Sequence, residues 1–145
     1  MTLPNPEIGL VVHYSYLWAD EHAGGAEEGI KNRPCAIVAA TRSVEGKIVV
    51  TVFPITHTPP SDPRDAVELP APLKRHLGLD DERSWVVVTE FNRFVWPGVD
   101  LQPRPGVTPR RYDYGVIPGK FMARVIEVFD AARRARRVAP VVRTD

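Results

Sequence analysis

Hydrophobic residues along the first hundred positions fall into short runs that predict β-strands. Between Ile8 and Trp18 the aromatic residues recur at every second position, so they would share one face of a pleated strand. Further apolar runs predict strands at Pro34–Thr41, Lys47–Ile55, Ala66–Leu69 and Ser84–Glu90. The last run is almost continuously apolar, so we expect it at the centre of a sheet, and Glu90–Gly98 is compatible with one more short strand.

The second and third predicted strands form a β-hairpin. Their connection, Ser43–Gly46, is short and contains a glycine, as suits a tight turn between antiparallel strands. Antiparallel pairing places the start of one strand beside the end of the other. We therefore expect Arg33, which precedes the first strand, and Thr56, which follows the second, to reach the same surface.

Proline and glycine predict where the loops lie. Ala19–Asn32 contains glycines and no sustained periodicity, and His57–Pro63 is rich in proline, so both segments are expected to be irregular. Pro72–Leu77 predicts one or two helical turns, closed by Gly78. The proline-rich segment at about 99–117 is expected to be a loop that is ordered by packing rather than by its own hydrogen bonds.

The C-terminal part of the chain predicts one long helix. Between about residues 118 and 137 the apolar residues recur at helical spacing and form one stripe, and Pro140 would stop the helix. Together these elements predict a mainly β (α+β) fold, with a small, strongly bent antiparallel sheet or barrel at about 8–98 and a terminal helix covering one end. At 145 residues, of which 43% are hydrophobic, the chain is predicted to form a single domain, 1–145.

Composition argues against several classes of protein. The chain has no apolar run of about 18 residues and no basic stretch followed by an apolar one at its start, so it predicts neither a membrane span nor a signal peptide and favours a cytoplasmic protein. Cys35 is the only cysteine and the four histidines are scattered, which is not the pattern of a disulfide framework or a zinc site. The glycines do not form a nucleotide-binding loop motif. No metal or cofactor is predicted.

The charge of the chain is unevenly distributed although its net value is only +1. Residues 102–145 hold 10 Lys and Arg against 4 Asp and Glu, so this part is basic by six. A polyanion could be held partly by this segment. The alternative is that arginines near the end of the predicted helix only oppose the negative end of its dipole.

Arg33 and Thr56 carry the main chemical hypothesis. The planar guanidinium fork of an arginine suits a phosphate that gains charge during transfer, so this pair points to phosphodiester chemistry. The alternative is that Arg33 is a solvated residue at a strand edge and Thr56 merely ends a strand. His57 invites a histidine acid or base mechanism as well, with His13 as its partner, although His13 is expected at the surface.

Contacts to unpaired bases can also be predicted from residue types. Trp96 flanks a loop, where an indole could stack on a base. Glu90 and Asn92 lie at the end of a predicted strand and offer base-edge hydrogen bonds of the kind that read single-stranded RNA. With His57, these residues are the candidate RNA contacts, and the alternative for each is a structural role.

Several of these features occur together in one known family. Gly9–Trp18 forms an early aromatic strand, Gly24–Asn32 a glycine-bearing loop, 33–38 reads Arg-Pro-Cys-Ala-Ile-Val, and the next strand closes in Pro54-Ile55-Thr56. Over about the first sixty residues the chain resembles the MazF/PemK toxins of toxin and antitoxin pairs. The stretch after Thr56 is richer in proline than the family pattern and the chain is longer than typical members. Trp96-Pro97-Gly98 and the segment Arg104–Arg111 have no counterpart in the pattern.

The resemblance implies an SH3-like barrel with a C-terminal helix, usually a homodimer, which a small antitoxin protein holds inactive. It also implies a metal-independent, sequence-selective endoribonuclease that cuts single-stranded RNA to a cyclic phosphate and a 5′-hydroxyl. Carried over by position, Arg33 would stabilise the extra charge on the phosphorane and could also protonate the leaving group, and Thr56 would donate a hydrogen bond to a phosphate oxygen. Glu28 would be the general base, with Glu27 equally plausible on its chemistry. The rival reading is a barrel without catalytic activity that binds nucleic acid or a protein partner.

Overall fold

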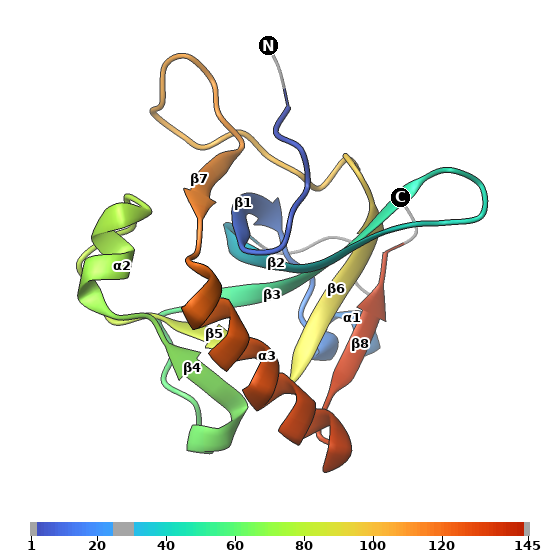
Figure 1. Cartoon of the computed structure of the whole chain (residues 1–145), viewed down its shortest axis with the longest axis vertical. Coiled ribbons are helices and arrows are strands. Elements are labelled where there is room, and N and C mark those ends of the chain that lie inside the picture. The colour runs from blue at the N-terminus through green and yellow to red at the C-terminus, as the bar shows by residue number, and fades with distance from the viewer. Residues whose placement is uncertain (1–2, 25–30, 144–145) are drawn as a thin grey trace.

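The computed structural model describes residues 3–24 and 31–143, which form a bent sheet with one long helix packed across it (Figure 1). In chain order the elements are β1 (Leu10–Ser15), α1 (Ala19–Ala23), β2 (Asn32–Arg42), β3 (Ile48–Thr56), a 3-10 turn (Pro63–Asp65), β4 (Ala66–Glu68), α2 (Ala71–His76), β5 (Trp85–Val87), β6 (Glu90–Val95), β7 (Asp113–Val116), α3 (Gly119–Arg134) and β8 (Ala139–Val142). The predicted mainly β fold is confirmed. None of the described helices is long and apolar enough to cross a membrane.

The strands pair in the order β4-β5-β3-β2-β1-β7, and all of these pairs are antiparallel. A branch adds β6, which pairs with β3, and β8, which runs parallel to β6. Strand β3 belongs both to the main strand order and to the branch: Val49–Val52 pairs with β6, whereas Ile55 and Thr56 pair with β5. The predicted hairpin is confirmed by the pairing of β2 with β3.

Both faces of the sheet are buried, each under its own hydrophobic cluster. One cluster fills the space beneath α3 and includes Val11, Phe53 and Val125. The other lies on the opposite face and includes Val12 and Tyr14, whose ring stacks on that of Phe94 with centroids 4.7 Å apart. Successive residues of a strand point to opposite faces, so adjacent valines of β1 reach different clusters.

The structure corrects several predicted boundaries. Strand β1 ends at Ser15 rather than Trp18, and a short helix, α1, occupies the start of the predicted loop Ala19–Asn32. The predicted strand Ser84–Glu90 is divided between β5 and the start of β6. These two strands pair with different parts of β3: β5 with Ile55 and Thr56, and β6 with Val49–Val52. The helix predicted at 118–137 ends at Arg134.

Two strands lie where the sequence predicted none. The segment 99–117 is not only a loop, because β7 forms within it and pairs with β1. Backbone hydrogen bonds thus help to order it, among them His13 N–H to the Tyr112 carbonyl at 2.8 Å. Pro140 lies in β8 rather than merely following a helix. Both strands pair with residues far away in the sequence, so neither can be recognised from a local pattern.

His13 is buried, which corrects its predicted surface position. Its Nδ1 lies 2.8 Å from the hydroxyl oxygen of Tyr114, on β7. The guanidinium of Arg104 lies over the Tyr114 ring, 4.2 Å from its centroid. Burial, together with the positive charge of Arg104, lowers the pKa of His13 below its ordinary value of 6.5.

The lowered pKa predicts how stability changes with pH. Below about pH 6.5 the unfolded chain binds a proton at His13 that the folded protein resists, so this contribution to stability falls as the solution is acidified. Above that pH both states carry neutral imidazole and the contribution is constant. We expect His13→Gln to flatten the dependence of the unfolding free energy on pH between 5 and 7, measured by urea denaturation. His76→Gln, at an exposed histidine, should keep the wild-type slope, and an unchanged slope in His13→Gln would contradict the assignment.

Candidate functional site

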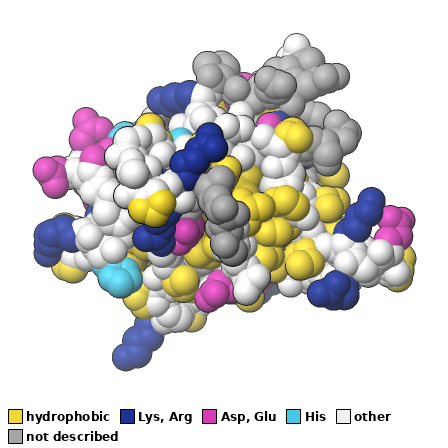
Figure 2. All heavy atoms as spheres, turned by 90° about the horizontal axis from the view of Figure 1, so that it is seen from above, with side chains coloured by type: hydrophobic (Ala, Val, Ile, Leu, Met, Phe, Trp, Pro, Cys, Tyr) yellow, Lys and Arg dark blue, Asp and Glu magenta, His cyan; other side chains and the backbone are white. Residues whose placement is uncertain are grey.

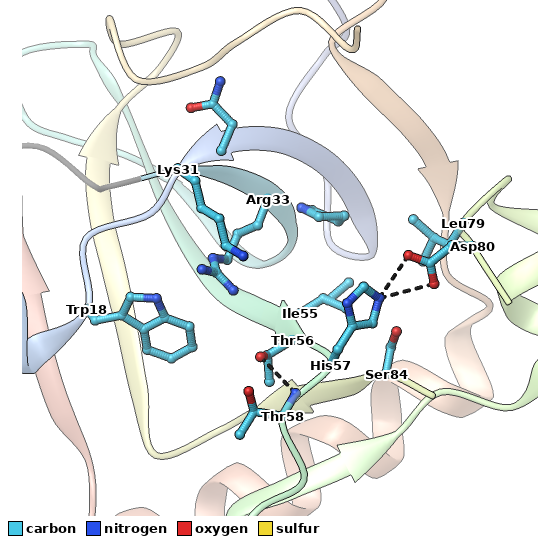
Figure 3. A pocket seen from close by; sticks show the side chains of 12 residues that line it. Trp18, Lys31, Arg33, Ile55, Thr56, His57, Thr58, Leu79, Asp80 and Ser84 are labelled. Atoms are coloured by element: carbon cyan, nitrogen blue, oxygen red, sulfur yellow. Dashed lines mark hydrogen bonds and ion pairs between the residues drawn. The ribbon is translucent and has the colours of Figure 1, made fainter. Parts of the chain in front are cut away.

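A pocket of about 390 Å³ opens where the start of β2 lies beside the end of β3 (Figure 3). Its lining residues come from four separate parts of the chain: Trp18; Lys31, Asn32, Arg33 and Pro34; Ile55, Thr56, His57 and Thr58; and Leu79, Asp80 and Ser84. The hairpin brings the second and third groups together, and the loop after α2 supplies the last group. The pocket therefore forms between the sheet and a loop that is distant from these strands in the sequence.

Arg33 and Thr56 both line this pocket, as predicted from the hairpin. In the register of β2 and β3, Cys35 faces Pro54. Arg33 lies two residues before Cys35 and Thr56 lies two residues after Pro54, so both belong to this end of the strand pair. The predicted juxtaposition is thus confirmed, while the catalytic roles of the two residues stay a prediction.

The charge of Arg33 is not neutralised by an ion pair with any residue in 3–24 or 31–143. Its guanidinium carbon lies 4.8 Å from the centroid of the Trp18 ring, a cation–π contact that holds the side chain at one wall of the pocket. Its Nε is buried and has no hydrogen-bond partner in the described part of the chain. Lys31 extends toward the same space (Figure 3). This wall is suited to an anion.

Thr56 presents a hydroxyl with its hydrogen available. Its Oγ1 accepts a hydrogen bond from the backbone N–H of Thr58 at 3.1 Å. A hydroxyl that accepts in this way still has its O–H to donate. The backbone contact also fixes the position of the oxygen beside Arg33, so both donors can address one bound group.

The opposite wall is formed by His57 and a set of charged residues around it. His57 Nε2 lies 2.8 Å from Asp80 Oδ2, and His57 Nδ1 lies 3.1 Å from Glu82 Oε2. Asp80 Oδ1 also accepts a hydrogen bond from Lys74 Nζ at 2.9 Å. Burial by itself would raise the pKa of Asp80, but the hydrogen bonds from Lys74 and His57 outweigh it and lower the pKa. Asp80 is therefore held as a carboxylate.

Ligand atoms of His57, Asp80 and Glu82 lie within 4.8 Å of one another, which is close enough for a shared cation. The contacts fit an ion-pair network better than a chelating set. The two ring nitrogens of His57 face different carboxylates, and a histidine offers a metal only one of them. The ammonium of Lys74 already supplies positive charge at Asp80.

Comparison with known proteins does not place the chain in a family. No family model matches it, and neither a curated protein nor a solved structure does.

The structure does not bring Glu90 into this pocket. Its carboxylate accepts hydrogen bonds from the Tyr16 hydroxyl at 3.1 Å and from the Ala19 backbone N–H at 2.9 Å. Partial burial raises the pKa of Glu90 more than these two hydrogen bonds lower it, with nearby acidic residues adding to the rise. In this conformation Glu90 fixes the start of α1.

Asn92 and Trp96 also lie away from the pocket. Asn92 is fully buried, its Oδ1 accepts from Leu17 N–H at 2.9 Å, and its Nδ2 donates to the Leu17 carbonyl at 2.8 Å. This corrects its predicted role, because an amide bonded in the interior cannot reach RNA. Trp96 directly follows Val95, the last residue of β6. Its ring packs beside that of Phe94, with ring centroids 6.2 Å apart.

The nominated bases, Glu28 and Glu27, lie outside the described residues, as does most of the glycine-bearing loop. Sequence reasoning missed Lys31, Lys74 and Asp80 as residues of this site. Lys31 could have been found from its positive charge and its position two residues before Arg33. Nothing local indicated the other two, because the loop that follows α2 brings Asp80 to the pocket and Lys74 contacts Asp80.

Proposed function

We propose that this protein is a metal-independent, sequence-selective endoribonuclease of the MazF/PemK type, with an SH3-like barrel as its fold. It cleaves single-stranded RNA to a 2′,3′-cyclic phosphate, or a 3′-phosphate, and a 5′-hydroxyl. The observation that carries the proposal is the placement of Arg33, which forms no ion pair with another described residue, and Thr56 in one open pocket. The motif resemblance supplies the reaction.

The pocket contains groups suited to each part of a bound phosphodiester. The Arg33 fork and the Thr56 hydroxyl would donate to the non-bridging oxygens, where negative charge increases as the 2′-oxygen attacks phosphorus. Lys31 adds a second positive charge. The indole of Trp18 offers a stacking surface for an adjoining base, and stacking on aromatic rings tolerates many sequences. The resemblance nominates Glu28 as the base that takes the 2′-hydroxyl proton.

We propose three features of its biology with this activity. The protein is a cytoplasmic toxin, a cognate antitoxin covers the Arg33 and Thr56 surface, and the active form is a homodimer. Figure 2 shows a face of the molecule on which hydrophobic side chains gather into a continuous area. Exposed apolar areas of this kind favour association with another protein surface.

The direct test is digestion of a long mixed-sequence RNA by the purified protein in excess chelator. We expect discrete cuts, each leaving a 5′-hydroxyl that a polynucleotide kinase can label without prior phosphatase treatment. Replacing the nucleotide 5′ to one mapped cut by its 2′-deoxy form should block that cut alone, because the attacking hydroxyl is then missing. Intact RNA, from folded protein free of any partner, would contradict the proposal and favour the rival, a non-catalytic barrel that binds nucleic acid or a protein.

A further inference from the structure

The imidazole of His57 is fixed at the wall of the pocket opposite Arg33 (Figure 3). The ring follows directly after Thr56, so it lies next to the position at which a phosphate would be bound. Its side chain is 50% exposed, which leaves it accessible to a substrate in the pocket. A histidine at this place can therefore touch the reacting groups of a bound phosphodiester.

Asp80 holds this imidazole in one orientation. The carboxylate lies 2.8 Å from Nε2 and is itself fixed by the ammonium of Lys74 and by the backbone N–H of Glu82, at 2.9 and 3.1 Å. Lys74 is buried, and it also donates a hydrogen bond to the Glu82 carbonyl. A solvent-exposed histidine without a function does not require a carboxylate partner that is itself fixed by hydrogen bonds. The arrangement matches the general pattern in which a carboxylate orients one ring nitrogen and the other carries out proton transfer.

The second ring nitrogen, Nδ1, faces Glu82 at 3.1 Å. The Glu82 side chain is 72% exposed, so it is not packed in place and a substrate can displace it. Both ring nitrogens face carboxylates, and this arrangement is fully satisfied when each nitrogen carries a hydrogen. Among the described residues, the charged side chains around the imidazole are Asp80, Glu82 and Lys74 on its own side, and Lys31 and Arg33 across the pocket.

We propose that His57 is the general acid of the ribonuclease reaction, with Asp80 as its positioning residue. This inference rests on the proposed function. The 2′-oxygen forms a bond to phosphorus and its proton passes to the general base, while the bond from phosphorus to the 5′-oxygen breaks. The electron pair of that bond goes to the 5′-oxygen, which takes the proton from His57 Nδ1. Solvent then returns a proton to the imidazole.

The role of His57 is tested by His57→Gln on two RNAs cut by the wild-type protein. We expect a loss of about 10²-fold or more on ordinary RNA, in the range for a lost general acid. In the second RNA a bridging sulfur replaces the 5′-oxygen at the cut. A thiolate leaves without prior protonation, since a thiol has a pKa of about 8.5. His57→Gln should then cleave this RNA at nearly the wild-type rate, and His76→Gln should match the wild type on both.

The role of Asp80 is tested with the same two RNAs. Asp80→Asn removes the carboxylate that orients the imidazole, so it should slow cleavage of ordinary RNA but cleave the RNA with the bridging sulfur at nearly the wild-type rate. A purely structural role of Asp80 would lower the rate on both RNAs equally.

Failure of this inference is distinguishable from failure of the proposed function. If the wild-type protein does not cleave RNA, the proposed function is wrong and the role of His57 falls with it. If the wild type cleaves but His57→Gln retains its rate on ordinary RNA, or is not rescued by the sulfur substrate, then the ribonuclease stands and His57 is not its general acid. Circular dichroism spectra that superimpose for the variants exclude misfolding as the cause of a lost rate.

Discussion

Arg33→Ala is expected to reduce RNA cleavage by the purified protein by a factor on the order of 10²–10³, the range seen when one donor to a transition-state charge is removed. In the pocket this guanidinium has no ion-pair partner among the described residues, so its charge is available to a phosphate. Its guanidinium carbon lies over the Trp18 ring, 4.8 Å from the ring centroid. A cation–π contact of this kind does not neutralise the charge of the arginine.

The measurement is the single-turnover rate of cleavage at one mapped site, so that product release does not mask the chemical step. Arg33→Lys should recover only part of the rate, because a lysine keeps the charge but lacks the planar fork. Arg42→Ala is the matched control, since Arg42 lies at the other end of β2 and donates to the Gly46 carbonyl in the hairpin turn. Equal rates for Arg33→Ala and Arg42→Ala would show that Arg33 does not act on the phosphate.

The largest loss of stability is expected from Arg143→Ala. Arg143 and Asp100 form an ion pair at 2.8 Å, and their side chains are only 3% and 8% exposed. Arg143 Nη1 also donates to the Ser15 carbonyl at 2.9 Å and to Asn92 Oδ1 at 3.1 Å. Removing one member of a buried pair takes away the counter-charge that the pair supplied to the other member, which costs about 3 to 5 kcal/mol.

We expect Arg143→Ala to lower the unfolding free energy, measured by urea denaturation, by an amount in that range. Arg83→Ala is the control, because it breaks an equally short but exposed pair with Glu68 and should change stability little. The double variant Arg143→Met, Asp100→Leu should be less destabilised than Arg143→Ala, since no unpaired charge remains. A loss no greater than that of Arg83→Ala would show that the pair contributes little to the folded state.

The buried ion pair also connects residues near the C-terminus to the rest of the sheet. Arg143 directly follows β8, and its contacts reach the end of β1 and the middle of β6. It therefore ties the parallel pair of β6 and β8 to the main part of the sheet. The sequence shows Arg143 only as one more basic residue in a basic tail, and its burial becomes visible only when the strands are assembled.

The local sequence determined the hairpin of β2 and β3, the long helix and the meeting of Arg33 with Thr56. Each of these depends on residues close to one another in the chain: a glycine turn sets a register, and apolar spacing sets one face of a helix. The tertiary structure alone decided the partners of His57, the strand pairs of β7 and β8, and the burial of His13 and Asn92. Their contacts join segments that are far apart in sequence, so no local pattern encodes them. Whether a polar side chain is a surface contact or a buried hydrogen-bonding group depends on which distant element covers it.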